Sequence, residues 1–238
     1  MGRSKKTVFA YLKERVWKRI QGWKEKLLSK AGKETLIKAV AQSIPSYAMS
    51  CFDLTKSLCN EMSGMICRYW WAQQDKENKM HWVSWEEMCR RKEEGGIGYR
   101  DLRLFNLAML ARQGWRILQN PDSLCAQLLR AKYGTNNSLL QAKEGPGISY
   151  TWRSIVRGLQ ALQKGLIWRI GDGMQIKIWE DPWIMNEITR RPITPRGHTV
   201  LTRVAELLHP DTGSWDEELV REVFWEEDVR HIATPTNP

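Results

Sequence analysis

Apolar residues recur every three or four positions through much of the chain, and this spacing limits the folds that it can adopt. A helix is predicted over residues 8–21, where the recurring residues are Val8, Leu12, Val16 and Ile20. The same period returns in further segments that we expect to be helical, at about 36–44 within the basic stretch 22–52, and at 58–70, 101–119, 123–133 and 152–162. The chain is therefore predicted to be mainly α-helical.

Local signals place several helix ends. Gly22 is a plausible break, and Pro45 should stop the helix before it. Ser84 followed by Glu87 forms a capping box, and Asp101 is a predicted N-cap. These signals divide the helical region into short and long segments.

The period changes after Gly165. Leu166, Trp168 and Ile170 alternate with polar positions, as do Met174, Ile176 and Ile178, and a glycine-rich turn lies between the two runs. This pattern predicts one β-hairpin at about 166–178. We expect a loop over 189–202, then short helices near 203–208 and from Asp216 to Trp225, and a frayed end over 233–238.

Two regions follow from these patterns. Residues 1–134 form a basic helical region, and residues 135–238 form a smaller α+β region with the hairpin and an acidic helical tail. The boundary is placed at the start of the loop-like residues 134–149.

The net charge of +10 indicates a polyanionic partner. The charge is unevenly distributed: residues 1–38 hold 12 Lys and Arg against 3 Glu, which gives +9. Residues 205–230 hold 9 Asp and Glu against 2 Arg, which gives −7. The predicted contact surface for nucleic acid is therefore the first part of the chain.

The candidate nucleic-acid-binding residues are Lys5, Lys6, Lys13, Arg15, Lys18, Arg19, Lys24, Lys26, Lys30, Lys33 and Lys38. Trp17 and Trp23 are interleaved with them and could pack or stack on bases. The alternative is a solvated helix face with tryptophans in the core. The pairs Trp70–Trp71, Trp82–Trp85 and Trp179–Trp183 are expected in the core or an interface.

Catalytic and metal-binding patterns are not predicted. The five cysteines (51, 59, 67, 89 and 125) contain no C-x-x-C pair and are expected to be reduced and mostly buried. The four histidines (81, 198, 209 and 231) lack metal-ligand spacing, and Asp172, Glu180 and Asp181 fit turns better than a divalent-cation site. No cofactor is expected.

No apolar run is long enough for a transmembrane helix, and no secretory signal is evident. The basic, amphipathic opening weakly resembles a transit peptide, although the helical pattern continues from it into the body of the protein. We expect an intracellular protein without a membrane partner.

Five blocks of the sequence resemble the reverse transcriptase polyproteins of plant LINE-type (non-LTR) retrotransposons, and the chain is also similar to short reading frames of plant mitochondrial genomes. The blocks are GRSKKTVFAYLKERVWKRIQGWKEKLLSKAGKETLIKAVAQSIPSYAMSCF, HWVSWEEMCRRKEEGGIGYRDLRLFNLAMLARQGWRIL, LLRAKYG, SYTWRSIVRGLQALQKGLIWRIGDG and IKIWEDPWI. They follow the order of the family and cover about residues 2–230.

The resemblance implies a thumb and connector region without a catalytic centre. In the family the palm carries a Y-x-D-D motif upstream of this region, and the chain contains no such tetrapeptide. The ribonuclease H carboxylates and the zinc-binding Cys and His residues of the family are also absent from the sequence. We therefore expect that the chain is not an enzyme.

By resemblance, the basic stretch 5–38 would contact the backbone of a template–primer duplex or an RNA–DNA hybrid. The resemblance favours the nucleus, with the mitochondrion as the alternative compartment. Other functions stay open: a helical interaction or scaffold protein that self-associates through exposed apolar surface, an active polymerase or nuclease, or a decayed reading frame without selected function.

Overall fold

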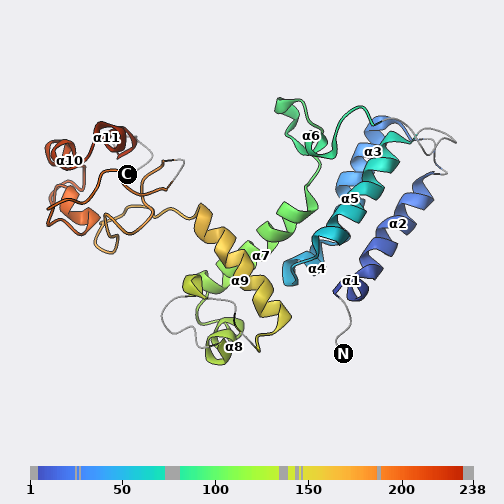
Figure 1. Cartoon of the computed structure of the whole chain (residues 1–238), viewed down its shortest axis with the longest axis horizontal. Helices are drawn as coiled ribbons and strands as arrows, with labels where there is room; N and C mark the ends of the chain where they lie inside the picture. The colour runs from blue at the N-terminus through green and yellow to red at the C-terminus, as the bar shows by residue number, and fades with distance from the viewer. Residues whose placement is uncertain are drawn as a thin grey trace. The chain divides into compact units, whose positions relative to one another are not determined.

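A computed structural model describes residues 5–24, 26, 28–72, 81–133, 139–142, 145, 147–186 and 189–232. The chain divides into two compact units, Met1–Lys164 and Gly165–Pro238, and each is described by itself. The described residues are mainly helical, as the apolar periodicity predicted (Figure 1). The expected frayed end at 233–238 lies outside the described residues.

The first unit is built from helices and short helical turns. They are α1 (Lys5–Val8), α2 (Ala10–Lys24), α3 (Lys30–Leu36), the π-helical turn η1 (Ile37–Ala41), α4 (Ser46–Cys51), α5 (Lys56–Trp71), α6 (Trp85–Cys89), the 3₁₀ turn η2 (Lys92–Glu94), α7 (Leu102–Gln119), α8 (Leu124–Tyr133), the 3₁₀ turn η3 (Leu139–Gln141) and α9 (Tyr150–Gly165). The second unit contains the 3₁₀ turn η4 (Val204–Leu207), α10 (Glu217–Val223) and α11 (Glu226–Ile232).

Most predicted helix ends are confirmed. Ser84 accepts from the backbone N–H of Glu87, and Asp101 accepts from those of Arg103 and Leu104. Pro45 is the last residue of the turn that ends the preceding helical segment, and α4 begins directly after it. The Gly22 break is wrong, because α2 continues through Gly22 to Lys24. One exposed glycine lowers helix stability by only about 1 kcal/mol, which the packing of α2 offsets.

The core of the first unit lies mainly where α2 packs against α5 (Figure 1). Leu12, Val16 and Ile20 supply the buried stripe of α2, and α5 contributes Leu58, Met62 and Ile66. The side chain of Thr55 caps α5 by accepting from the N–H of Leu58. This pairing fixes the direction in which the opposite, basic face of α2 points.

Buried Asn106 connects α7 to α4 and to the loop between α4 and α5. Its Nδ2 donates to the carbonyl oxygens of Met49 (2.8 Å) and Phe52 (2.9 Å), and its Oδ1 accepts from the N–H of Leu54 (2.8 Å). The connecting loop therefore keeps its buried backbone groups paired, as a buried loop must.

Helix α9 crosses α7 at glycines. A Cβ on Gly158 would lie 2.4 Å from the carbonyl carbon of Leu110, and one on Gly114 would lie 2.6 Å from Cδ2 of Leu159. The side chains of α7, α8 and α9 share one apolar cluster. For this reason the units divide at 164/165, later than the 134/135 boundary expected from the sequence.

The predicted β-hairpin at 166–178 does not form. The N–H of Ile178 donates to the oxygen of Thr202, and the N–H of Val204 donates to the oxygen of Ile176, both at 3.0 Å. The described residues of this unit contain isolated bridges, Lys177 to Arg203 and Leu208 to Trp215, and no strand pair.

The alternating pattern is confirmed near 176–178, where buried Ile176 and Ile178 flank exposed Lys177, but the partner segment differs from the prediction. Gly173 explains the difference. It has a φ of 68°, and a Cβ there would lie 2.5 Å from the nitrogen of Ala205. This glycine permits a close approach to η4, so the segment packs on 202–205 instead of folding back on 166–170.

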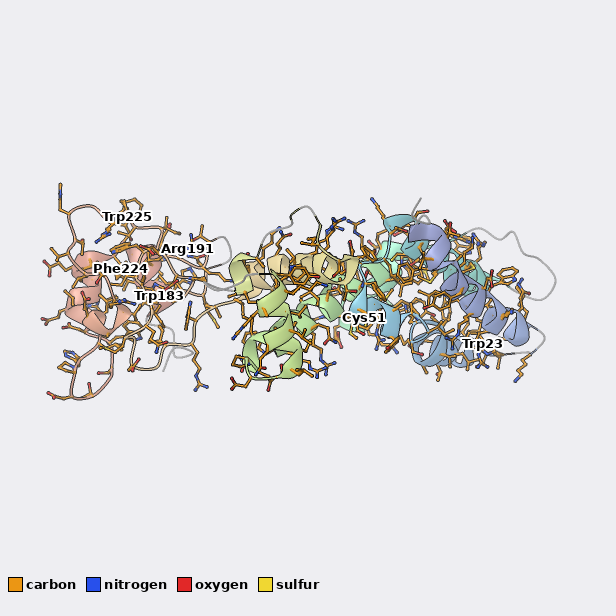
Figure 2. The ribbon with its side chains drawn as sticks, turned by 90° about the horizontal axis from the view of Figure 1, so that it is seen from below. Trp23, Cys51, Trp183, Arg191, Phe224 and Trp225 are labelled. Carbon is orange, nitrogen blue, oxygen red and sulfur yellow. The ribbon has the colours of Figure 1, made fainter. Side chains whose placement is uncertain are left out.

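The second unit has its own core around Trp183, which packs edge-on against Phe224 with ring centroids 6.2 Å apart (Figure 2). Fully buried Asp228 of α11 accepts from the N–H groups of Ile193 and Thr194 and from the Thr194 hydroxyl. The Asp228 side chain therefore connects α11 to the segment 189–202, which was expected to be a loop. The sequence predicted one helix from Asp216 to Trp225, whereas the chain breaks after Val223 and continues as α11.

The cysteines are only partly as expected. Cys59 and Cys67 are buried, Cys51 and Cys89 are half-buried, and Cys125 is exposed. Among the described residues, no helix combines the length and apolar character that crossing a membrane requires.

Candidate nucleic-acid interface

The basic residues of α2 lie on its outer side because its apolar stripe is used by the core. Arg15, Lys18 and Arg19 are exposed and stand three and four residues apart, so they are neighbours on one helix face. Within the described part of the chain, no hydrogen bond or ion pair engages their side chains. Arg15 and Arg19 are like charges at i and i+4, which destabilises a helix by about 0.2–0.5 kcal/mol. This cluster, which we call the α2 basic face, is suited to contact an anion.

Other predicted residues near α2 are engaged within the protein. Lys13 Nζ forms an ion pair with Glu61 of α5 at 2.7 Å, and Lys24 Nζ lies 5.5 Å from the centroid of the Trp17 ring. Lys26 is exposed just beyond the end of α2. The two tryptophans differ: Trp23 is 9% exposed and packs in the core, whereas Trp17 is 45% exposed.

Lys30 and Lys33 of α3 point toward the end of α5. Lys30 Nζ donates to the carbonyl oxygen of Trp70 (2.8 Å), and Lys33 Nζ donates to that of Ala72 (2.5 Å). Carbonyls at a helix C-terminus lack intrahelical partners and carry partial negative charge, so these lysines cap α5. Burial, with a smaller contribution from Lys30, lowers the pKa of Lys33.

Lys38 also has internal partners. Its Nζ lies 2.8 Å from Oε1 of Glu34 and 2.6 Å from the carbonyl oxygen of Ile97. Glu34 pairs with Lys92 as well, and the hydrogen bonds from both lysines hold the pKa of the Glu34 carboxyl below its usual value. Lys38 therefore ties η1 to the loop that precedes α7.

The eleven predicted residues thus fall into separate groups. The side chains of Lys5 and Lys6 lie outside the described residues. Arg15, Lys18 and Arg19 face solvent together, whereas Lys30, Lys33 and Lys38 lie against α5 and the 97–100 loop. The sequence prediction missed Arg68, an exposed cation of α5 that lines a groove together with Trp17. Arg68 lies four residues before Ala72 on a predicted helix. This position in the sequence does not indicate that its side chain would face α2.

The other predicted aromatic pairs are mostly internal. Trp70 and Trp183 are buried, and Trp71, Trp85 and Trp179 are half-buried. Trp82 differs from the expectation because it is exposed.

The described residues hold no group of three or more His, Cys, Asp or Glu side chains arranged to bind a metal ion. Cys67 Sγ lies 3.6 Å from His81 Nδ1. Burial raises the pKa of the Cys67 thiol, which disfavours the thiolate that metal binding requires.

Comparison with known proteins gives two informative relatives, both from Arabidopsis thaliana. The uncharacterized mitochondrial protein AtMg00310 is 42% identical over 152 residues, which are 63% of this chain and 99% of that protein. The putative ribonuclease H protein At1g65750 is 38% identical over 186 residues, which are 76% of this chain and 30% of that protein. No protein family profile and no solved structure matches the chain.

Both relatives are typical of plant reading frames derived from retroelements, which supports the resemblance at that level. The chain spans less than a third of the longer relative, so the activity of that whole protein does not transfer to it.

Proposed function

Since the chain belongs to the family of the uncharacterized mitochondrial protein AtMg00310, we propose that it is a retroelement-derived, non-catalytic protein that binds nucleic-acid backbone through the α2 basic face. In this proposal the chain corresponds to the thumb and connector of a LINE-type reverse transcriptase. The ligand is a template–primer duplex or an RNA–DNA hybrid, bound without regard to sequence.

The α2 basic face is the observation that carries the proposal. Arg15, Lys18 and Arg19 repel one another, and they do not serve the internal contacts that occupy Lys30, Lys33 and Lys38. Phosphates would replace this repulsion with charge-assisted hydrogen bonds. Phosphate contacts carry no sequence information directly, which suits a sequence-independent grip.

The site is therefore narrower than the stretch 5–38. Removing Lys30, Lys33 or Lys38 should act mainly on folding, because their amino groups already bind backbone carbonyls. Removing the residues of the α2 basic face should act mainly on binding.

The test is a triple charge reversal, Arg15→Glu, Lys18→Glu and Arg19→Glu, measured by fluorescence anisotropy with a labelled RNA–DNA hybrid. The matched control reverses three exposed cations of α7 and α8, Arg112→Glu, Arg116→Glu and Lys132→Glu, with the same change in net charge. We expect at least tenfold weaker binding for the first variant and a much smaller effect for the control. Equal losses in both would show that net charge, and not the α2 basic face, governs binding.

The absence of catalysis is part of the same proposal. A primer-extension assay with the purified chain should give no product above the blank. Extension that a single carboxylate substitution abolishes would contradict it.

A second candidate function is self-association, which apolar side chains on α7 and α8 favour. Leu104 is 65% exposed and Leu124 is 75% exposed, and Trp115 and Leu128 are also open to solvent. Exposed apolar surface of this kind drives association between proteins. Sedimentation velocity should then detect oligomers that Leu124→Glu with Leu128→Glu dissociates, whereas a concentration-independent monomer would remove this candidate.

A further inference from the structure

Helices α2 and α5 leave an open groove of about 420 Å³ between them. Its lining includes Lys13, Glu14, Trp17, Glu61, Gly64 and Arg68. Pockets of this size, 300 Å³ or more, are typical of small-molecule ligands. Gly64 keeps the groove open on the α5 side, since it has no side chain to fill the space.

Trp17 is the aromatic wall of the groove. The core does not require it, because Leu12, Val16 and Ile20 already form the buried stripe of α2. Trp17 is 45% exposed, which leaves apolar surface in water. An aromatic ring in this setting is suited to stack on another flat ring.

Charged groups of both signs lie near the ring. Lys24 Nζ lies 5.5 Å from the Trp17 centroid, while Lys13 with Glu14 and Arg68 with Glu61 line the groove on its α2 and α5 sides. Glu61 is the partner of Lys13, whereas Arg68 forms no ion pair within the described residues. Lys24 and Arg68 are therefore the cations that would contact the phosphate backbone of a flat base stacked on Trp17.

We infer that this groove binds one unpaired nucleobase of a single-stranded nucleic acid, with its ring stacked on Trp17 and the flanking phosphates near Lys24 and Arg68. The inference rests on the proposed function and adds to it. The α2 basic face would bind the backbone of single-stranded or duplex nucleic acid, whereas the groove would bind only a base that lies outside a duplex. Stacking tolerates any base, so no sequence preference follows.

The test uses Gly64→Leu, which fills the groove without removing a charge. A Cβ at Gly64 meets only Arg68 Nη1 at 3.7 Å, and replacing a helical glycine should favour the fold. Gly22→Leu is the matched control, because Gly22 is an exposed glycine of α2 that lies outside the groove. Trp17→Ala is the second variant, since it removes the stacking ring from an exposed position.

The probes are a single-stranded 12-nucleotide oligodeoxyadenylate and an abasic strand of the same length, which has the same phosphates but no bases. The measured quantity is the ratio of the two Kd values at fixed salt. We expect the wild type and Gly22→Leu to bind the adenylate about tenfold more tightly than the abasic strand. Gly64→Leu and Trp17→Ala should bring the ratio close to one.

A ratio that neither Gly64→Leu nor Trp17→Ala changes would overturn the inference, as would a wild type that binds both strands equally. In either case, retained binding to an RNA–DNA hybrid would leave the proposed function standing. A wild type that binds neither strand nor hybrid at low salt would remove both.

Discussion

Lys30 Nζ lies 2.8 Å from the carbonyl oxygen of Trp70 and 4.6 Å from the centroid of its indole ring. The Lys30 ammonium group thus caps the C-terminal end of α5 and lies over the ring of Trp70, which is buried near that end. Lys33 repeats the arrangement one turn later, with Ala72 as acceptor and the Tyr69 ring 5.2 Å away. Two lysines that the charge pattern assigned to nucleic acid are therefore part of the packing between α3 and α5.

Lys30→Met and Lys33→Met should each lower the free energy of unfolding by about 1 kcal/mol, because each removes a charge-assisted hydrogen bond and a cation–π contact. Urea titration followed by circular dichroism measures this loss. Binding to an RNA–DNA hybrid should change less than twofold in either variant. Lys18→Met provides the comparison, with unchanged stability and weaker binding. The reverse pattern, stable but binding-deficient Lys30 and Lys33 variants, would contradict the assignment.

The sequence predicted the helices well because each depends on local signals: an apolar period, a capping side chain or a stop residue. Ser84, Asp101 and Pro45 act on the backbone next to them, so their effects need no knowledge of the rest of the chain. The same holds for the buried alternation of Ile176 and Ile178.

Long-range features could not be predicted in this way. The pairing of 176–178 with 202–204 depends on the close approach at Gly173, which no local pattern reveals. Which lysines make internal contacts and which face solvent likewise depends on where α5 ends in space. Lys30 and Lys33 lie 40 and 39 residues from their acceptors along the chain. Composition located the basic region, but only the packing of α2 against α5 separates its solvent-facing side from its internal contacts.

The crossing of α7 and α9 should not accept a methyl group at Gly158. Gly158→Ala is expected to lower the free energy of unfolding by about 2 kcal/mol or more, because its Cβ would collide with the rigid backbone of Leu110. Gly22→Ala should instead raise stability by about 0.5–1 kcal/mol, since nothing lies within 4 Å of its Cβ. Thermal and urea unfolding of both variants measures the contrast. A tolerated Gly158→Ala would mean that α7 and α9 do not cross closely.

Asn106 should be among the least replaceable polar residues of the first unit. Asn106→Ala removes the partners of one carbonyl in α4 and of one carbonyl and one N–H in the loop before α5, at a cost of about 3 kcal/mol. Asn120→Ala is the control, because Asn120 makes one exposed hydrogen bond to the Arg116 carbonyl. Urea unfolding should show a large loss for the first variant and less than about 1 kcal/mol for the second.

Stability should fall in alkaline solution because of two thiols, the buried Cys59 and the half-buried Cys89. Burial raises the pKa of Cys59 to about 11 and that of Cys89 to about 12, above the usual thiol value. In the unfolded chain these thiols ionise first, so their contribution is fully present below the unfolded pKa and is lost as pH rises through the folded values. Unfolding in urea with a reductant, between pH 8 and 11, measures the slope.

Cys59→Ala should make the pH profile flatter. The exposed Cys125 offers a second test through its accessibility. At pH 8, a thiol reagent should modify Cys125 first in the folded protein. Early modification of Cys59 would show that the core between α2 and α5 is open.

The central claim, a backbone grip through the α2 basic face, is tested most directly by the salt dependence of hybrid binding. The affinity for an RNA–DNA hybrid should be measured from about 50 to 200 mM KCl for the wild type and for the Arg15→Ala, Lys18→Ala, Arg19→Ala triple variant. The account predicts that the logarithm of the wild-type binding constant falls steeply and linearly with the logarithm of salt. The slope of the triple variant should be shallower by about 0.9 for each phosphate that it no longer neutralises. Salt-independent binding, the same slope in both proteins, or no binding at the lowest salt would contradict the claim.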